Sequence, residues 1–221
     1  MNISEATLSL LGKGTWETIV MTFTSGLFSF ILGLPLGILL FLTRERQLLE
    51  NKLWNRIIAF FVNIFRSIPF IILIVWMIPF TRAVVGTSIG MQAAIVPLSI
   101  GAAPFVARLV ENCLLEVPYG IIEAARSMGA SSMQIIRKVL IPEALPGLIN
   151  SASLTLITLV GYSAMGGAVG AGGLGHIGYQ YGYVGYDALI MNLVLLLLIL
   201  LVFAIQFIGD RLSKYVDHRK N

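Results

Sequence analysis

Residues 123–142 read EAARSMGASSMQIIRKVLIP, a polar stretch inside a chain that is otherwise strongly apolar. Glu123, Ala124 and Ala125 open it with residues that favour helix, and glutamate suits the early part of a helix because of the macrodipole. Gly129 then interrupts the pattern with a residue that adopts positive φ at little cost. The stretch therefore predicts a short helix that ends in a turn at Gly129.

A second short helix is predicted directly after this turn. Ser131, with Gln134 three residues later, matches a capping box, in which each side chain bonds the other's backbone N–H. Pro142 and Pro146 are expected to end this second helix, because proline lacks the N–H that a helix interior needs. We thus expect two short helices that lie at an angle to each other.

The composition places this polar stretch in a membrane protein. The chain has 221 residues, of which 57% are hydrophobic and 12% charged, with a mean hydropathy of +0.88, whereas soluble domains carry roughly 25% charged residues. A helix needs about 20 apolar residues to cross the hydrocarbon core. Five segments qualify, at about 18–42, 57–80, 90–110, 146–165 and 188–208. The second is the least regular, because Arg66 lies inside it and Pro69 follows, so a start nearer Arg66 after an interfacial stretch is equally compatible.

The basic residues orient these spans. Twelve of the fifteen Lys and Arg residues lie in the 43–56 loop, in the connection between the third and fourth spans, and in the C-terminal tail, whereas only Lys13 and Arg82 lie on the other side. The positive-inside rule then predicts an external N-terminus and a cytoplasmic C-terminus, with residues 123–142 in the cytoplasm. The basic residues form no long runs, which disfavours a nucleic-acid partner.

A cytoplasmic loop with this pattern allows two interpretations. Small side chains at Ala124 and Ala125 permit close backbone approach, so the first short helix could dock in a groove of another protein. Alternatively, the loop could be an amphipathic segment that rests on lipid. The spacing by itself does not choose between them.

The stretch resembles the EAA motif of ATP-binding-cassette (ABC) importer permeases. That motif is Glu-Ala-Ala, three residues, Gly, nine residues and Ile-x-Leu-Pro, and here Val139 and Ile141 replace its Ile and Leu. In that family the loop forms the coupling helix, which sits in a cleft of a cytoplasmic ATPase subunit. The resemblance implies ATPase-coupling roles for Glu123, Ala124, Ala125, Arg126, Met128, Gly129, Ala130, Ser131 and Pro142.

The resemblance covers nearly the whole chain. GTWETIVMTFTSG, NIFRSIPFIILIVWMIPFTR and LITLVGYSAMGGAVGAGGLGHIGYQYGY are all similar to the permease subunits of bacterial methionine importers. It implies an all-α integral membrane protein with the five-helix core of type I ABC importer permeases, used as a homodimer in the bacterial cytoplasmic membrane. Its partners would be two ATPase subunits, which carry ATP and Mg²⁺, and an external lipoprotein that delivers L- and D-methionine. The chain would divide into an external segment at 1–17, a transmembrane domain at 18–208 with a coupling loop at 111–146, and a cytoplasmic tail at 209–221.

A glycine- and tyrosine-rich segment follows the fourth span. Residues 161–186 hold ten glycines and five tyrosines, and Gly170, Gly172 and Gly175 fit G-x-G-x-x-G. No βαβ unit is predicted around it, so a dinucleotide site is disfavoured. We expect instead a closely packed outer end of the fourth span, with tyrosines at the membrane interface. Spacing of the G-x-x-x-G type also predicts helix contacts at 33–37 and 166–170.

The sequence indicates less about the translocation path than about any other feature. Small residues run from 151 to 170, which suggests that the fourth span lines a path with Met165, Ser163 and Tyr162 as candidate gate residues. A packed helix core is the alternative interpretation. His176 and Cys113 are expected to be ordinary loop and core residues, and no metal cluster is predicted.

Other function classes fit the sequence less well. No G-x-x-x-x-G-K-[ST] motif occurs, so ATP hydrolysis would belong to a separate chain. A stand-alone ion-coupled transporter usually needs an ionisable residue near the midplane; Glu17 and Glu111 are expected at span ends, and Arg66 could pair with Glu111. Sodium sites made only of carbonyls remain compatible with the sequence. No Ser/His, paired Asp or His/Glu site for a membrane enzyme is visible.

Overall fold

The computed structural model describes residues 5–217, and every regular element within this part of the chain is a helix. The α-helices are α1 (Glu5–Leu42), α2 (Lys52–Ser67), α3 (Phe70–Trp76), α4 (Ile78–Val85), α5 (Met91–Leu115), α6 (Tyr119–Ser127), α7 (Ser132–Ile135), α8 (Ile141–Gly167), α9 (Gly173–Ile177) and α10 (Ala188–Val216). Two π-helical segments, η1 (Ile136–Leu140) and η2 (Gly178–Val184), precede α8 and α10.

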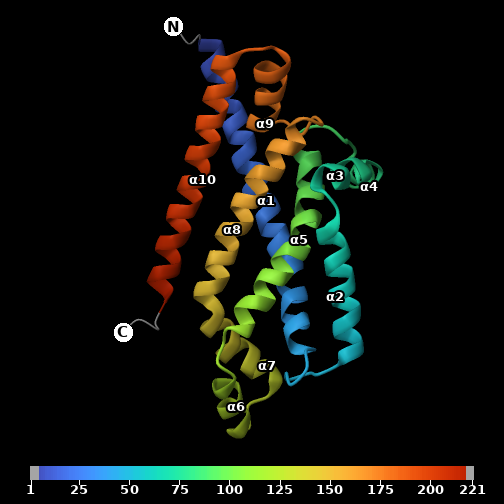
Figure 1. Cartoon of the computed structure of the whole chain (residues 1–221), viewed down its shortest axis with the longest axis vertical. Coiled ribbons are helices and arrows are strands. Elements are labelled where there is room, and N and C mark those ends of the chain that lie inside the picture. The colour runs from blue at the N-terminus through green and yellow to red at the C-terminus, as the bar shows by residue number, and fades with distance from the viewer. Residues whose placement is uncertain (1–4, 218–221) are drawn as a thin grey trace.

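The long helices run side by side along the molecule. Four helices are each long and apolar enough to cross a membrane: α1, α5, the continuous helix from Ser132 to Gly167, and α10. The bent pair of α2 and α3 makes a fifth span if it is counted as one. In Figure 1 these helices run from the end that carries α9 to the end that carries α6 and α7. The predicted all-helical architecture with up to five spans is therefore confirmed.

Glycine brings α1 and α5 into close contact. A Cβ added to Gly33 would lie 2.6 Å from the Ala103 carbonyl oxygen, and one added to Gly37 would lie 2.6 Å from the Val110 Cβ. Small residues allow helix backbones to approach in this way where lipid tails give no hydrophobic drive for association. The contact predicted from the spacing at 33–37 is thus confirmed, with α5 as the partner.

The second predicted span is not one continuous helix. α2 and α3 meet at an angle of 98° across a short break. Ile68 is extended, with φ −80° and ψ 123°, and Pro69 follows it. A residue before proline is pushed out of the α region, so the chain turns here and the expectation of an unbroken 57–80 helix is wrong. A second interruption at Met77 separates α3 from α4.

Several helices are longer than the sequence suggested. α1 already begins at Glu5, so most of the segment expected to precede the first span is helical, and α10 continues to Val216. The prediction that Pro142 and Pro146 end the second short helix is also wrong, because helix continues from Ser132 to Gly167. In η1 the Ile141 N–H donates to the Ile136 carbonyl, five residues back instead of four. The hydrogen bonds of a regular α-helix are therefore already interrupted at the point where Pro142 lacks an N–H.

Candidate functional site

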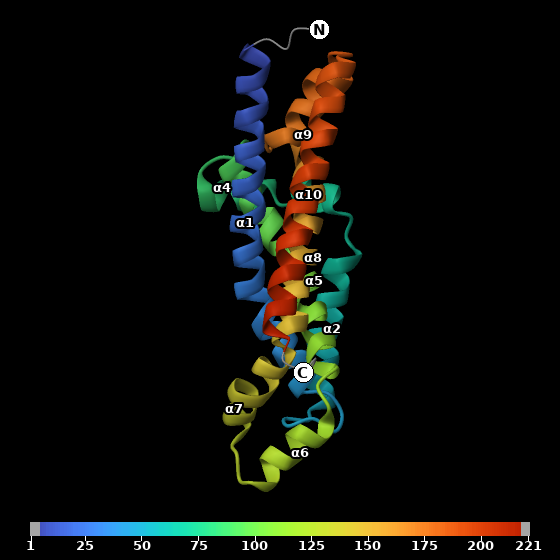
Figure 2. The same ribbon diagram turned by 90° about the vertical axis from the view of Figure 1, so that its left-hand side faces the viewer.

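The predicted coupling loop forms one end of the molecule. α6 and α7 project beyond the ends of the long helices in both views (Figures 1 and 2). Ile122 and Ala125 of α6 are buried and join a core cluster with residues of α1 and α5. Glu123 and Ala124 face away from this core and are exposed. α6 is therefore attached to the bundle by one side and offers the other side for contact.

The turn after α6 has the geometry that the sequence predicts. Gly129 has φ +82°, and a Cβ placed there would meet nothing within 4 Å, so backbone conformation alone requires the glycine. Ser131 N–H donates to Gln134 Oε1 at 2.8 Å, and Gln134 N–H donates to Ser131 Oγ at 3.4 Å. The capping box is confirmed. Met128 before the turn is 82% exposed, Ala130 is half-buried, and Arg126 and Pro142 are exposed.

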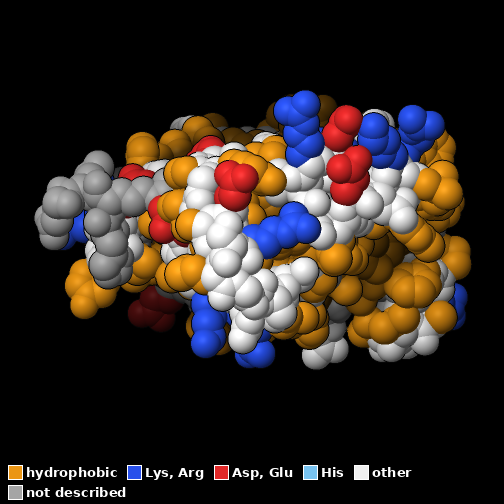
Figure 3. Space-filling view, turned by 90° about the horizontal axis from the view of Figure 1, so that it is seen from below, with side chains coloured by type: hydrophobic (Ala, Val, Ile, Leu, Met, Phe, Trp, Pro, Cys, Tyr) orange, Lys and Arg blue, Asp and Glu red, His pale blue; other side chains and the backbone are white. Residues whose placement is uncertain are grey.

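A cavity of about 370 Å³ lies between α6 and the 43–51 loop. Glu123 and Arg126 line it from α6, and Arg46 and Gln47 line it from the loop. Gln47 Oε1 is buried and accepts no hydrogen bond from the described residues. Figure 3 looks onto this end of the molecule and shows basic and acidic side chains spread over it between hydrophobic edges. No pattern in the sequence indicates that α6 and the 43–51 loop share a cavity.

A buried ion pair network lies next to this end. Glu111 is only 4% exposed, and its carboxylate lies 2.6 Å from Arg108 Nη1 and 3.5 Å from Arg44 Nη1. Arg108 Nη2 also donates to Asn63 Oδ1 of α2 at 2.9 Å. Glu111 lies near the end of α5, as expected, but the expectation that it could pair with Arg66 is wrong. Arg108 and Glu111 are three residues apart, a spacing that places both side chains on one face of a helix. This spacing could have indicated Arg108 as the partner of Glu111.

The nearby surface pair is of a different kind. Lys52 Nζ donates to Glu45 Oε1 at 3.0 Å, and both side chains are about two-thirds exposed. The Lys52 ammonium lowers the pKa of the Glu45 carboxyl, first through this hydrogen bond and then through its charge. An exposed pair of this kind contributes little to stability because water screens it.

The three candidate gate residues in α8 do not share one environment. Ser163 is buried, and its hydroxyl donates to the Val160 carbonyl at 2.8 Å. The Tyr162 ring stacks on the Phe70 ring of α3, with centroids 4.4 Å apart. Met165 is 52% exposed. Of the three, Met165 is the side chain that this protomer leaves free, while Tyr162 connects α8 to the broken span.

The glycine-rich segment after α8 is held against α1. Gly173 N–H donates to Glu17 Oε2 at 2.8 Å, and Leu174 N–H donates to Thr18 Oγ1 at 2.9 Å. Gly170 has φ +91° and lies outside α8, so the helix contact predicted from the 166–170 spacing is wrong. The sequence did not predict these contacts of Glu17 and Thr18, because nothing local links positions 156 residues apart.

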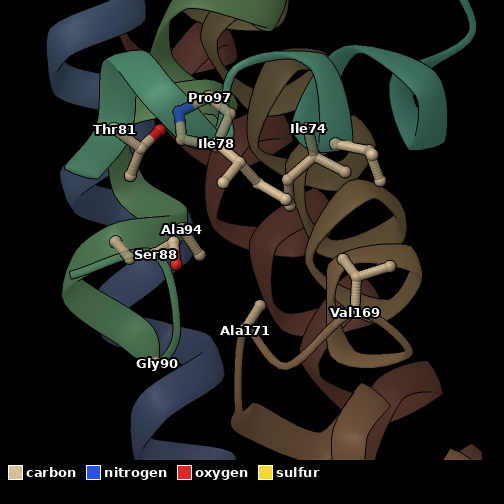
Figure 4. A pocket seen from close by; sticks show the side chains of 11 residues that line it. Ile74, Ile78, Thr81, Ser88, Gly90, Ala94, Pro97, Val169 and Ala171 are labelled. Carbon is tan, nitrogen blue, oxygen red and sulfur yellow. The ribbon is translucent and has the colours of Figure 1, made fainter. Parts of the chain in front are cut away.

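A small cavity of about 30 Å³ lies where this segment meets the broken span (Figure 4). Val169 and Ala171 line it from the segment, and Ile74 and Thr81 line it from α3 and α4. Thr81 Oγ1 is buried and has no hydrogen-bond partner among the described residues. Within residues 5–217 no three His, Cys, Asp or Glu side chains are grouped to hold a metal ion.

Long apolar helices with a charged loop region at one end define a multi-pass helical membrane protein. Comparison with known families gives the class directly. The family described as "Binding-protein-dependent transport system inner membrane component" matches residues 33–221, and the chain belongs to this family. It is therefore a multi-pass permease component of the bacterial inner membrane.

Individual relatives agree with this family. The chain is 67% identical over 217 residues to the D-methionine transport system permease protein MetI of Yersinia pestis, covering 98% of this chain and 100% of that one. It is 56% identical over 210 residues to a probable D-methionine transport system permease protein MetI of Vibrio cholerae, covering 95% and 93% of the two chains. Both matches cover the α6–α7 loop as well as the spans.

Solved structures show the same fold. A chain from inward-facing conformations of the MetNI methionine ABC transporter has a TM-score of 0.96 at 67% identity, covering 98% of this chain and 100% of that one. A chain from an amino acid ABC transporter with histidines has a TM-score of 0.77 at 18% identity and covers 97% of this chain and 100% of that one. The second likeness extends the shared fold to distant sequences.

Proposed function

We propose that this chain forms the translocation pathway of an ATP-driven importer for methionine, in its L and D forms. The observation that carries the proposal is the high identity, over essentially the full length, to permeases named for D-methionine transport. The similar solved protomers, which are named for a methionine ABC transporter, support the same substrate.

A separate ATPase supplies the energy in this proposal. The sequence holds no G-x-x-x-x-G-K-[ST] motif, and α6 presents Glu123, Ala124 and Met128 on its exposed side. We assign the ATPase to this side, with the α6 end in the cytoplasm as the distribution of basic residues predicts. Arg126, Gly129, Ala130, Ser131 and Pro142 then shape the loop that the ATPase contacts.

Two copies of the chain build the pathway. The long helix α10 has only 17% of its most apolar window buried within the protomer, and five spans are few to enclose a path on their own. A homodimer with two ATPase subunits covers more of these faces, and an external methionine-binding lipoprotein delivers the substrate at the α9 end. ATP binding would draw the two α6 helices together and switch the bundle from inward-facing to outward-facing.

Within this pathway we assign the gate to α8. Met165 is exposed in the protomer, whereas Tyr162 and Ser163 are packed against neighbours and support its position. Transport by Met165→Ala and Met165→Trp variants tests this assignment. Unchanged transport rates in both variants would remove Met165 from the gate.

Copurification tests the ATPase partner. Glu123→Lys reverses a charge on the exposed side of α6 and is expected to release the ATPase from the purified permease. Glu50→Lys makes the same charge change in the 43–51 loop and is expected to retain it. A permease that transports methionine at the full rate without any ATPase would overturn the proposal.

A further inference from the structure

All polar residues of α2 lie on one side of the helix. They recur every three or four positions along the helix, and Ala59 occupies the one position of this series that is not polar. The polar residues are Lys52, Asn55, Arg56, Asn63, Arg66 and Ser67. At about 100° per residue, these positions fall within an arc of roughly 120°. The rest of α2 is apolar. A span with a polar stripe of this kind places that stripe toward water or protein rather than toward lipid.

Arg66 is the deepest cation of this stripe. It lies in the last turn of α2, just before the 98° break, and its side chain is exposed in the protomer. Fourteen residues separate it from Lys52, which is about 21 Å along a helix, against roughly 30 Å of hydrocarbon. The Arg66 guanidinium forms no hydrogen bond or ion pair with any other side chain or backbone group of residues 5–217.

The chain itself does not offer Arg66 an acidic partner at this depth. The carboxylate of Glu111 is bound to Arg108 and Arg44, and that of Glu17 accepts the Gly173 N–H. Asp210 lies within two turns of the end of α10 and accepts from Gln206 at 2.7 Å. A second copy of the chain brings the same carboxylates with the same partners. None of these three carboxylates is left for Arg66, so its guanidinium is open to an anion from outside the protein.

The position of Arg66 also connects it with the candidate path. Phe70 follows four residues later, at the start of α3, and its ring stacks on Tyr162 of α8. Tyr162 lies one helical turn from Met165, and Figure 1 shows α3 beside the α9-side half of α8. Arg66 and Met165 are therefore each within four residues of the contact that joins α3 to α8.

We propose that the guanidinium of Arg66 faces the water-filled passage of the permease and binds the α-carboxylate of the amino acid as it passes. This inference rests on the proposed function, because it takes an amino acid as the substrate. A guanidinium fits a carboxylate through two parallel hydrogen bonds. The site would recognise the part that all α-amino acids share and leave side-chain selection to other groups.

Thiol labelling tests where Arg66 points. Cys113 is the single cysteine, so a Cys113→Ala background allows Arg66→Cys to be probed alone in the assembled complex. A charged, membrane-impermeant thiosulfonate is expected to modify Arg66→Cys. Ile64→Cys, about 160° away around the helix, is expected to stay unmodified. Labelling of Arg66→Cys only by an apolar reagent, or equal labelling at both positions, would overturn the inference.

Transport stoichiometry tests the carboxylate contact. In proteoliposomes that contain permease, ATPase and binding protein, Arg66→Gln is expected to lower methionine uptake per ATP hydrolysed by about tenfold or more. Arg66→Lys should keep more uptake, because the charge remains. Arg82→Gln removes an exposed arginine of α4 and should change nothing.

The outcomes separate the two proposals. If the wild-type complex moves no methionine, the proposed function fails. If the wild-type complex transports and Arg66→Gln keeps its uptake per ATP, only the role of Arg66 fails. If the Arg66→Gln complex does not assemble, the Arg66→Lys variant decides between the two explanations. Full uptake per ATP in Arg66→Lys supports a cation in the passage. Loss of assembly in both variants assigns Arg66 to folding.

Discussion

Gly37 of α1 lies so close to α5 that an added Cβ would fall 2.5 Å from the Ala107 carbonyl oxygen. Together with Gly33 one turn earlier, it fixes the separation of the two helices that share the most extensive contact in the bundle. α5 leads into α6, and α1 contacts the glycine-rich segment, so this contact joins the two helices that carry these parts of the molecule.

Gly37→Ala is expected to lower the stability of the permease by about 1–3 kcal/mol, since an added Cβ would overlap the backbone carbonyl oxygen of Ala107 and the Cβ of the β-branched Val110, neither of which moves aside easily. The midpoint of unfolding in mixed detergent micelles measures this change. Gly12→Ala in the same helix is the matched control, because a Cβ there meets nothing within 4 Å. Equal effects of the two substitutions would contradict the close contact.

Glu111→Gln is expected to destabilise the protein by about 3 kcal/mol, because it leaves Arg108 partly buried without its carboxylate. Glu45→Gln removes an exposed carboxylate from its pair with Lys52 and should have little effect. Thermal unfolding of the detergent-solubilised protein compares the two variants. A small effect at Glu111 would show that the network does not stabilise the fold.

Thr18→Val removes the oxygen that accepts the Leu174 N–H while keeping the shape of the side chain. The buried N–H then lacks a partner, at a cost of about 1–3 kcal/mol. Hydrogen exchange should become faster around residues 172–177 and stay unchanged in α6. In Thr15→Val, whose hydroxyl bonds only within α1, exchange in this segment should match the wild type.

Gly129→Val is expected to distort the turn between α6 and α7, since φ +82° costs a β-branched residue more than glycine. Gly129→Asn should be milder, because asparagine tolerates this conformation. The amount of ATPase that copurifies with each variant measures the effect. Gly120→Ala in α6, where φ is not positive and space is open, should retain the ATPase fully.

Local patterns predicted local structure well. Ser131 and Gln134 form the expected capping box, and Gly129 adopts positive φ, because each depends on neighbours within a few residues. The contact at Gly33 and Gly37 was also predicted, although the sequence did not name α5 as the partner. The local structure at the α6–α7 end of the molecule could therefore largely be predicted from the sequence.

Contacts between distant residues were not predicted. Glu111 was expected near a span end and is buried between two arginines, one of them 67 positions away. Glu17 and Thr18 hold a segment 156 residues later, through backbone N–H groups that no side-chain pattern reveals. Pro142 was misjudged because proline ends a regular α-helix but fits after a π-helical turn.

The unbroken helix from Ser132 to Gly167 has a mechanical consequence. Its 36 residues span about 54 Å. A regular helix resists compression, so an axial displacement imposed at Ser132 reaches Met165 almost undiminished. The backbone hydrogen-bond pattern changes at the π-helical turn at 136–140 and at Pro146, which lacks an N–H. The rod is longer than the roughly 30 Å of hydrocarbon, and its stiffness sets how much of a movement at the α6 end arrives at the opposite side.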